Sequence, residues 1–304
     1  MPVQSVTGPV AASDLGFTLP HEHVFINLMP EYRGDGLLND TDLMVDELTR
    51  YRESGGVSVV EVTSGGLDRD PDGLRRVSER SGVTIVMGSG YYRDPYLPGG
   101  EIDRRGVDGL AEEIVHDIEV GVGETGIRAG IIGEVGCDKS YVSAAEERSL
   151  RAAARAQKRT GLVITTHAAR WPVGHPQLDI FEHEGVDLRR VIVGHCDSVP
   201  DPDYHVSLAR RGALVQFDML GIYTSEYEQA KRVGFVMNMV KRGFADRVLL
   251  SHDVCLRGAL HANGGVGYTH LVDSFLPRLR SAGLDEDVLL GFTTHNVARV
   301  IEPR

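Results

Sequence analysis

Two histidines one residue apart, His21 and His23, are the first residues in the chain whose types and spacing could do chemistry. They stand at the end of a run that predicts a strand, Phe17 to His23. Side chains two positions apart in a strand point to the same face, so both imidazoles can face one point while Glu22 faces the other side. Two imidazoles directed at one point suit a metal ion. Two histidines with this spacing are usually unrelated polar residues when they occur alone. The rest of the chain therefore decides whether they bind a metal ion.

Four more potential ligands follow apolar, strand-like runs. Glu134, His167, His195 and Asp253 each end such a run. Any one of them alone is easily explained as a half-exposed polar residue or an ordinary loop carboxylate, but six at equivalent positions are hard to assign to chance. Four histidines and two carboxylates are too many for one tetrahedral zinc ion, and they fit two ions that share a bridging carboxylate.

These residues have to be positioned by a regular alternation of strands and helices. The expected strands are Phe17 to His23, Val57 to Thr63, Thr84 to Gly88, Ala129 to Glu134, Leu162 to His167, Val191 to His195, Leu214 to Asp218 and Val248 to Asp253. Helical patterns between them include Asp42 to Ser54, Val107 to Val120, Ala144 to Arg159 (opened by a capping box of Ser143 and Glu146) and Glu226 to Arg242. Eight strands separated by helices predict a (β/α)8 TIM barrel of the α/β class, with a doubly wound open sheet as the alternative. In a barrel the six candidate ligands surround one mouth, at the C-terminal ends of the strands.

The segments outside this alternation have expected roles of their own. Residues 1–304 are expected to form a single domain in which residues 1–16 are a small N-terminal cap. The Gly-rich loop from Leu256 to Gly267 is expected to cover the active site. Thr269 to Ser281 should be the last barrel helix, followed by a further helix near Thr294 to Ile301.

Composition narrows the class of partner and the cell compartment. The net charge of −12 argues against a nucleic-acid or anionic-membrane surface. Three widely spaced cysteines fit reduced thiols in the cytosol. The sequence shows no signal-peptide pattern at its start and no run of apolar residues long enough to span a membrane. We expect a cytoplasmic enzyme that acts on a small molecule and forms a homodimer.

Several motifs together resemble the phosphotriesterase-related branch of the amidohydrolase superfamily. They are Pro20-His21-Glu22-His23, Gly88-Ser89-Gly90-Tyr91-Tyr92, Gly133-Glu134-Val135-Gly136, Thr166-His167, Gly194-His195-Cys196-Asp197, Ser251-His252-Asp253 and Gly264-Gly265-Val266-Gly267-Tyr268. The resemblance implies a barrel with two divalent metal ions, zinc first, with manganese, cobalt or iron as alternatives. It assigns His21, His23 and Asp253 to the buried ion, and it assigns His167 and His195 to the outer ion. The strand-four side chain, Glu134, and a hydroxide would bridge the two ions.

One departure from the founding phosphotriesterases bears on the substrate. Those enzymes place a carboxylated lysine at the bridge, whereas this chain has Glu134, as in the phosphotriesterase homology proteins. The resemblance therefore favours a lactone, such as a sugar lactone, or an N-acyl compound over an organophosphate, which stays the alternative. A ligand-binding barrel without catalysis is a distant third reading, because it predicts an incomplete ligand set.

The expected mechanism assigns roles to three side chains. The metal-bridging hydroxide would attack the substrate carbonyl, and Asp253 would accept the proton and pass it to the leaving group. Tyr92 is expected to line the substrate pocket. Arg257, four residues after Asp253, could pair with an anionic group of the substrate.

Overall fold

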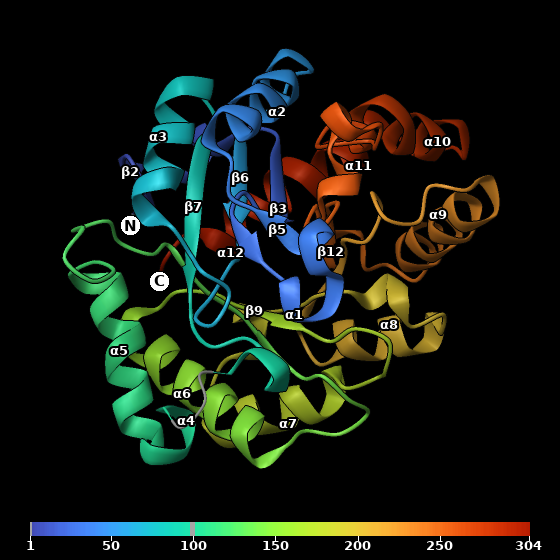
Figure 1. The fold of residues 1–304 in the computed structure, drawn as a ribbon. Coiled ribbons are helices and arrows are strands. Elements are labelled where there is room, and N and C mark those ends of the chain that lie inside the picture. Colours follow the sequence, from blue (N-terminus) through green and yellow to red (C-terminus); the bar gives the residue numbers. More distant parts are fainter. Residues whose placement is uncertain (1, 98–100) are drawn as a thin grey trace.

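The computed structural model describes residues 2–97 and 101–304, and it shows a barrel of strands surrounded by helices (Figure 1). Eight parallel strands follow one another around the barrel in the order of the chain. They are β3 (Thr18–Glu22), β6 (Ser58–Glu61), β7 (Thr84–Ser89), β8 (Ile131–Gly136), β9 (Ile164–His167), β10 (Val191–Val193), β11 (Leu214–Phe217) and β12 (Val248–Leu250). The predicted (β/α)8 barrel is confirmed, and the open sheet is not observed.

Side chains join the two ends of the sheet, β3 and β12. The Glu22 carboxylate accepts hydrogen bonds from the Ser251 hydroxyl (2.7 Å) and from the backbone N–H groups of His252 and Val254 (both 2.9 Å). The Ser251 hydroxyl also donates to the carbonyl of His21 at 3.0 Å. Glu22 therefore turns away from the two histidines beside it, as strand alternation predicts, and fixes the loop that carries the next ligand.

Helices surround the barrel, and Figure 1 shows most of them as a ring around the strands, with α1 (Met29–Tyr32) and α12 (Asn296–Ile301) nearer the middle of the view. The helices are α1 (Met29–Tyr32), α2 (Thr41–Glu53), α3 (Pro71–Ser81), α4 (Glu101–Arg104), α5 (Val107–Glu119), α6 (Ala144–Thr160), α7 (Gly174–His183), α8 (Pro202–Arg210), α9 (Glu226–Lys241), α10 (Leu276–Ser281), α11 (Glu286–Leu290) and α12 (Asn296–Ile301). The predicted capping box is present, because Ser143 accepts from the Glu146 N–H and Glu146 accepts from the Ser143 N–H. Among the residues described, no helix is both long and apolar enough to cross a membrane.

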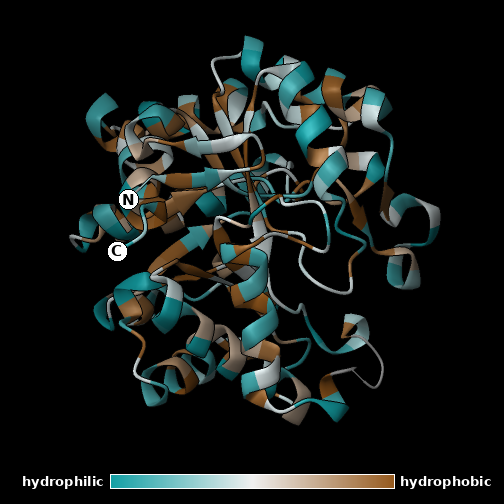
Figure 2. Ribbon diagram, turned by 90° about the vertical axis from the view of Figure 1, so that its left-hand side faces the viewer, coloured by the Kyte–Doolittle hydropathy of each residue, from teal (hydrophilic) through white to brown (hydrophobic). Residues whose placement is uncertain are grey.

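The barrel interior is packed with branched aliphatic side chains. Val60, Val86, Ile131, Ile192 and Leu249 belong to one buried cluster inside it. Figure 2 shows the strands mainly in the brown of hydrophobic residues, while the surrounding helices carry much teal. Such a filled barrel leaves room for chemistry only at its ends.

The two ends of the chain meet this cluster on the side away from the ligands. Val3 and Leu15 join it from the N-terminal segment, and Val297 and Val300 join it from α12. The N-terminal segment forms the short hairpin β1 (Val3–Ser5) and β2 (Gly8–Val10) and a 3₁₀ turn at Ala12–Leu15. The division into one domain with a cap over residues 1–16 stays a prediction, and residue 1 lies outside the described residues.

The structure corrects several expected boundaries. β10 and β12 end at Val193 and Leu250, two or three residues before the ligands that follow them. Tight turns therefore carry these ligands, not the strands themselves. The last barrel helix begins with a π-helical segment, Leu271–Phe275, before α10, and another π-helical segment, Gly291–His295, leads into α12.

The Gly-rich loop expected to cover the site is held against the outside of the barrel. Glu47 in α2 accepts hydrogen bonds from the N–H groups of His261 (3.1 Å) and Ala262 (2.8 Å), and Asp35 accepts from Gly258 (2.8 Å). The only residue of this loop that lines the pocket at the barrel mouth is Leu256.

A second two-stranded sheet, β4 (Ile26–Asn27) and β5 (Leu37–Leu38), lies in the segment between β3 and α2.

Candidate metal centre

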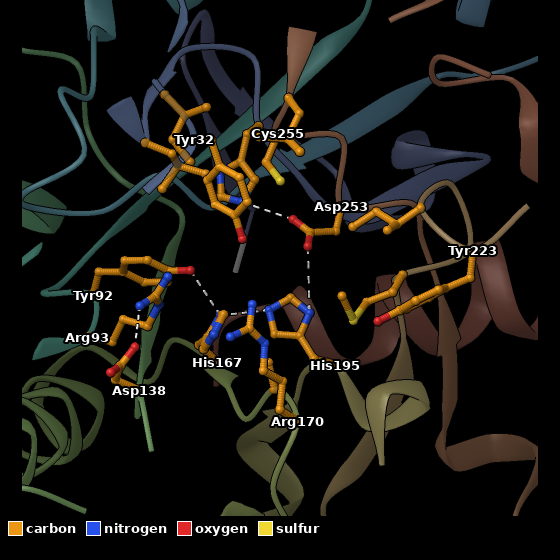
Figure 3. A pocket seen from close by; sticks show the side chains of 17 residues that line it. Tyr32, Tyr92, Arg93, Asp138, His167, Arg170, His195, Tyr223, Asp253 and Cys255 are labelled. Atoms are coloured by element: carbon orange, nitrogen blue, oxygen red, sulfur yellow. Dashed lines mark hydrogen bonds and ion pairs between the residues drawn. The ribbon is translucent and has the colours of Figure 1, made fainter. Parts of the chain in front are cut away.

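The structure brings the six predicted ligands together at the C-terminal ends of the strands. His21 and His23 come from β3 and the residue after it, whereas Glu134 lies within β8 and His167 ends β9. The other two, His195 and Asp253, follow β10 and β12. Four of the side chains are almost fully buried, whereas those of His167 and Asp253 are 13% and 10% exposed. Figure 3 shows His167, His195 and Asp253 converging on one opening.

One group of ligand atoms surrounds a point deep in the barrel. His23 Nε2 lies 3.3 Å from Asp253 Oδ1 and 3.5 Å from Glu134 Oε1. His21 Nε2 lies 3.6 Å from Glu134 Oε2 and 3.8 Å from Asp253 Oδ1, and no group in the described chain forms a hydrogen bond with this buried nitrogen. Two ligands about 2.1 Å from one ion lie about 3.4 Å apart at a tetrahedral angle. The separations thus fit atoms that share a metal ion better than hydrogen-bonded pairs.

A second group lies nearer the opening and includes the other oxygen of Glu134. His167 Nδ1 is 3.1 Å and His195 Nε2 is 3.3 Å from Glu134 Oε2, and the two nitrogens are 2.8 Å apart. Glu134 Oε1 therefore faces His23 of the first group, and Oε2 lies between His21 of that group and both histidines of the second. A carboxylate in this position can bridge two cations.

Asp218, which follows β11, supports one histidine of each group, and the sequence analysis did not identify it. Its Oδ1 lies 2.8 Å from His195 Nδ1 and its Oδ2 lies 3.1 Å from His21 Nδ1. These nitrogens are on the far side of each ring from the Nε2 atoms that face the ligand groups. Carboxylates that hold the second nitrogen of a metal-binding histidine fix the tautomer and the orientation of the ring. The only signal in the sequence was its place at the end of a predicted strand.

Charges inside the cluster favour a cation. Burial opposes ionisation of Glu134, but the imidazoles of His21 and His167 outweigh burial and hold the pKa of this carboxyl well below its usual range. Burial also lowers the pKa of His23, but the nearby carboxylates of Asp253 and Glu134 outweigh it and raise that pKa to about 10. For His167, burial and the neighbouring His195 lower the pKa to about 4. Carboxylates that hold a proton on a buried imidazole would equally stabilise a metal ion beside it.

Two of the ligands have a backbone conformation that is uncommon outside glycine. His195 has a φ of 54° and Asp253 a φ of 55°. Left-handed conformations persist in such residues where the surroundings impose them, often at functional sites. Here they turn each side chain into the barrel mouth just after a strand has ended.

A pocket with a cavity of about 220 Å³ opens above the ligands. Tyr92 lines it, as predicted, and its hydroxyl lies 3.1 Å from His167 Nδ1 (Figure 3). Arg257, the predicted anion-binding residue, lies in a 3₁₀ turn outside the lining, so its role stays a prediction. Two arginines that the sequence analysis did not single out, Arg93 and Arg170, line the pocket instead.

Comparison with known proteins decides the family. The model of the phosphotriesterase family matches residues 1–301. The chain belongs to the phosphotriesterase family. It is 36% identical to a phosphotriesterase homology protein of Escherichia coli over 90% of this chain and 95% of that protein. It is 28% identical to an N-acetyltaurine hydrolase of Dictyostelium discoideum, over 98% and 97% of the two chains. A lactonase of Listeria monocytogenes has the same fold, with a TM-score of 0.92 and 25% identity over 100% of both chains.

Membership has two consequences for this chain. The protein is a hydrolase, and its family is metal-dependent. The ligand groups described above give that metal a place, since three sets of His, Asp and Glu side chains in the described residues could hold an ion. The family does not fix the substrate, because the matching proteins are named for different ones.

Proposed function

We propose that this protein hydrolyses a small polar carbonyl compound, a lactone or an N-acyl compound, at a centre of two divalent ions. The observation that carries the proposal is the position of Glu134, whose carboxylate lies between the two groups of ligands and faces histidine nitrogens of both. His21, His23 and Asp253 would hold the inner ion, and His167 and His195 would hold the outer one. Nitrogen and carboxylate ligands favour zinc, with manganese, cobalt or iron as alternatives.

The bound ions would polarise the carbonyl oxygen and make water acidic enough to ionise near neutral pH. The chain's own residues would complete the chemistry. Asp253 lines the pocket beside both ligand groups and is placed to accept a proton from the attacking water and pass it to the leaving group. Tyr92 would donate a hydrogen bond to a substrate oxygen. Burial and the nearby Glu134 raise the pKa of this phenol well above its usual range, so it stays protonated.

The size of the pocket supports a small substrate. A cavity of about 220 Å³ is smaller than the roughly 300–1,000 Å³ of pockets that hold drug-sized ligands. Bulky apolar triesters would fit poorly, so organophosphate hydrolysis is the second candidate. The names of similar proteins support both parts of the proposal, since one is an N-acetyltaurine hydrolase and another a lactonase.

A substrate screen of the metal-loaded protein tests the proposal. Purified protein is reconstituted with zinc and assayed on γ- and δ-lactones, N-acyl amino acids, N-acyl aminosulfonates and a neutral aryl phosphotriester, with Asp253→Asn as the inactive control. We expect kcat/KM for a lactone or an N-acyl compound to exceed that for the triester by at least about 100-fold. A triester as the best substrate would favour the second candidate. Turnover of none of them, with both ions bound, would favour a ligand-binding barrel.

The remaining expectations about partners stay proposals. The net charge of −12 supports the absence of a nucleic-acid or anionic-membrane partner. We further propose a cytoplasmic homodimer, and light scattering of the purified protein tests its oligomeric state.

A further inference from the structure

The two arginines that line the pocket have different surroundings, and the first of them, Arg93, has its charge fully paired. Its guanidinium donates to both carboxylate oxygens of Glu31, at 2.9 and 2.7 Å, and to Asp138. It also lies 5.0 Å from the ring centre of Tyr92 and 5.1 Å from that of Tyr96. With two carboxylates and two aromatic rings around it, this buried side chain holds the pocket wall together, and only its buried Nε lacks a hydrogen-bond partner among the described residues.

The second arginine, Arg170, is exposed at the pocket and has no such partner. It follows β9 by three residues and lines the same cavity as His167 and His195. Nowhere in residues 2–97 and 101–304 does a group form a hydrogen bond or an ion pair with its guanidinium. Figure 3 shows its side chain directed into the opening that these histidines face.

The backbone fixes the direction of this side chain. Arg170 has a φ of 69°, a left-handed conformation that is uncommon for a residue with a side chain. Its N–H donates to Ser198 Oγ at 2.7 Å, and the Ser198 hydroxyl donates to the carbonyl of His195 at 2.7 Å. The loop that carries the arginine is therefore tied to the turn that carries a metal ligand. Backbone strain maintained in this way is common where a residue contacts a ligand.

Of the charges around the pocket, only Glu31 acts on this guanidinium, through an electrostatic interaction without a hydrogen bond or an ion pair, and Glu31 itself pairs with Arg93. Asp138, the other charged residue of the lining apart from the candidate metal ligand Asp253, is paired with Arg93. A guanidinium without a hydrogen-bond partner at the edge of a pocket favours a planar or tetrahedral oxyanion, which it can bind with two parallel hydrogen bonds. It disfavours a cationic substrate group at the same place.

We propose that Arg170 binds a carboxylate or sulfonate of the substrate, which lies a few atoms from the carbonyl that is hydrolysed. The substrate class would then be an N-acyl amino acid, an N-acyl aminosulfonate or a lactone with an anionic substituent. This inference rests on the proposed function for its reaction, but the binding of the anion can be tested without turnover.

Kinetics on matched substrates test the role of Arg170. The probes are N-acetyl-β-alanine, N-acetyl-2-aminoethanesulfonate and the uncharged N-acetyl-β-alaninamide, assayed with metal-loaded wild type, Arg170→Ala and Arg170→Lys. Arg50→Ala is the matched control, since Arg50 is exposed on α2 away from the pocket. Arg170→Ala should lower kcat/KM for the anionic probes about 10- to 150-fold, as expected for a hydrogen bond to a charged group, and less than about threefold for the amide. Arg170→Lys should recover part of the loss, and Arg50→Ala should behave as wild type.

Three outcomes would overturn the inference. They are a wild type that prefers the amide, equal losses on charged and uncharged probes, and a selective loss in Arg257→Ala with none in Arg170→Ala. The last would assign the anion to Arg257. If the wild type hydrolyses none of the probes or lactones, the proposed function fails, and calorimetric binding of the same probes still decides about Arg170. Anionic probes that bind to Arg170→Ala as tightly as to wild type would refute its role.

Discussion

Removal of the Asp218 carboxylate should weaken the binding of both metal ions, although Asp218 is not assigned as a ligand of either. Burial opposes its ionisation, but His195 and His21 outweigh burial and hold the pKa of Asp218 below its usual range. It is therefore ionised at neutral pH, and its two oxygens are shared between these histidines. In Asp218→Ala both imidazoles lose the acceptor that fixes their tautomer and orientation.

The expected loss of metal affinity follows from the number of histidines that Asp218 contacts. Loss of such a supporting group typically lowers metal affinity 10- to 100-fold, which is about 1.4–2.7 kcal/mol of binding free energy. Because one carboxylate supports a ligand in each group, Asp218→Ala should show this loss at both ions. Asp218→Asn keeps one oxygen, so it can support only one imidazole and should weaken one ion more than the other.

Competition with a chromophoric chelator measures both dissociation constants, and thermal unfolding shows whether each variant is folded. Asp117→Asn is the control, because Asp117 is also a buried carboxylate, paired with Arg69 and Ser89 at 2.7 Å, but lies outside the pocket. It should lower stability without changing either metal constant. A folded Asp218→Ala protein that binds both ions with wild-type affinity would refute the supporting role. Weaker binding of only one of the two ions would refute the idea that Asp218 supports a ligand of each.

Three other substitutions give separate tests. Glu134→Gln should lose most metal and lower turnover by orders of magnitude, because a neutral amide does not offset the repulsion of two cations. Full metal content with near-normal kcat would make the bridge assignment wrong. Glu22→Gln should lower the free energy of unfolding in urea by roughly 1.5–3 kcal/mol, since one amide oxygen replaces a carboxylate that accepts four hydrogen bonds at the β3–β12 junction; an unchanged midpoint would contradict this. Burial raises the pKa of Glu61 from 4.5 to about 7, so ionisation of this carboxyl costs stability as pH rises through that range. In metal-free protein the advantage of Glu61→Gln over wild type should grow by up to about 3 kcal/mol between pH 4.5 and 7, and a constant difference would contradict the raised pKa.

The barrel and the six candidate ligands could be predicted because both depend on local sequence patterns. Alternating strands and helices fix the barrel, and a barrel places the ends of all strands at one mouth. Residues such as His167, which ends its strand, are then brought together whatever the loops do. His195 and Asp253 lie at the mouth even though both follow their strands in left-handed turns, because a shift of two or three residues is small compared with the width of the mouth.

The pocket wall could not be predicted in the same way, because long-range contacts set it. Arg257 follows a predicted ligand closely, but the hydrogen bonds from its loop to Asp35 and Glu47 direct that loop along the outside of the barrel. Arg93 depends on Glu31, which is far away in the sequence. Arg170 is distinguished by the partners it lacks, and no pattern in the sequence reports that.

The number of metal ions bound per chain tests the central claim most directly. Metal-free protein is titrated with zinc, manganese or cobalt, and bound metal is measured by elemental analysis while turnover is followed in parallel. The arrangement of Glu134 between two ligand groups predicts saturation at about two equivalents per chain, with full activity only when the second is bound. Saturation at one equivalent, or full turnover by the metal-free protein, would contradict a centre of two ions.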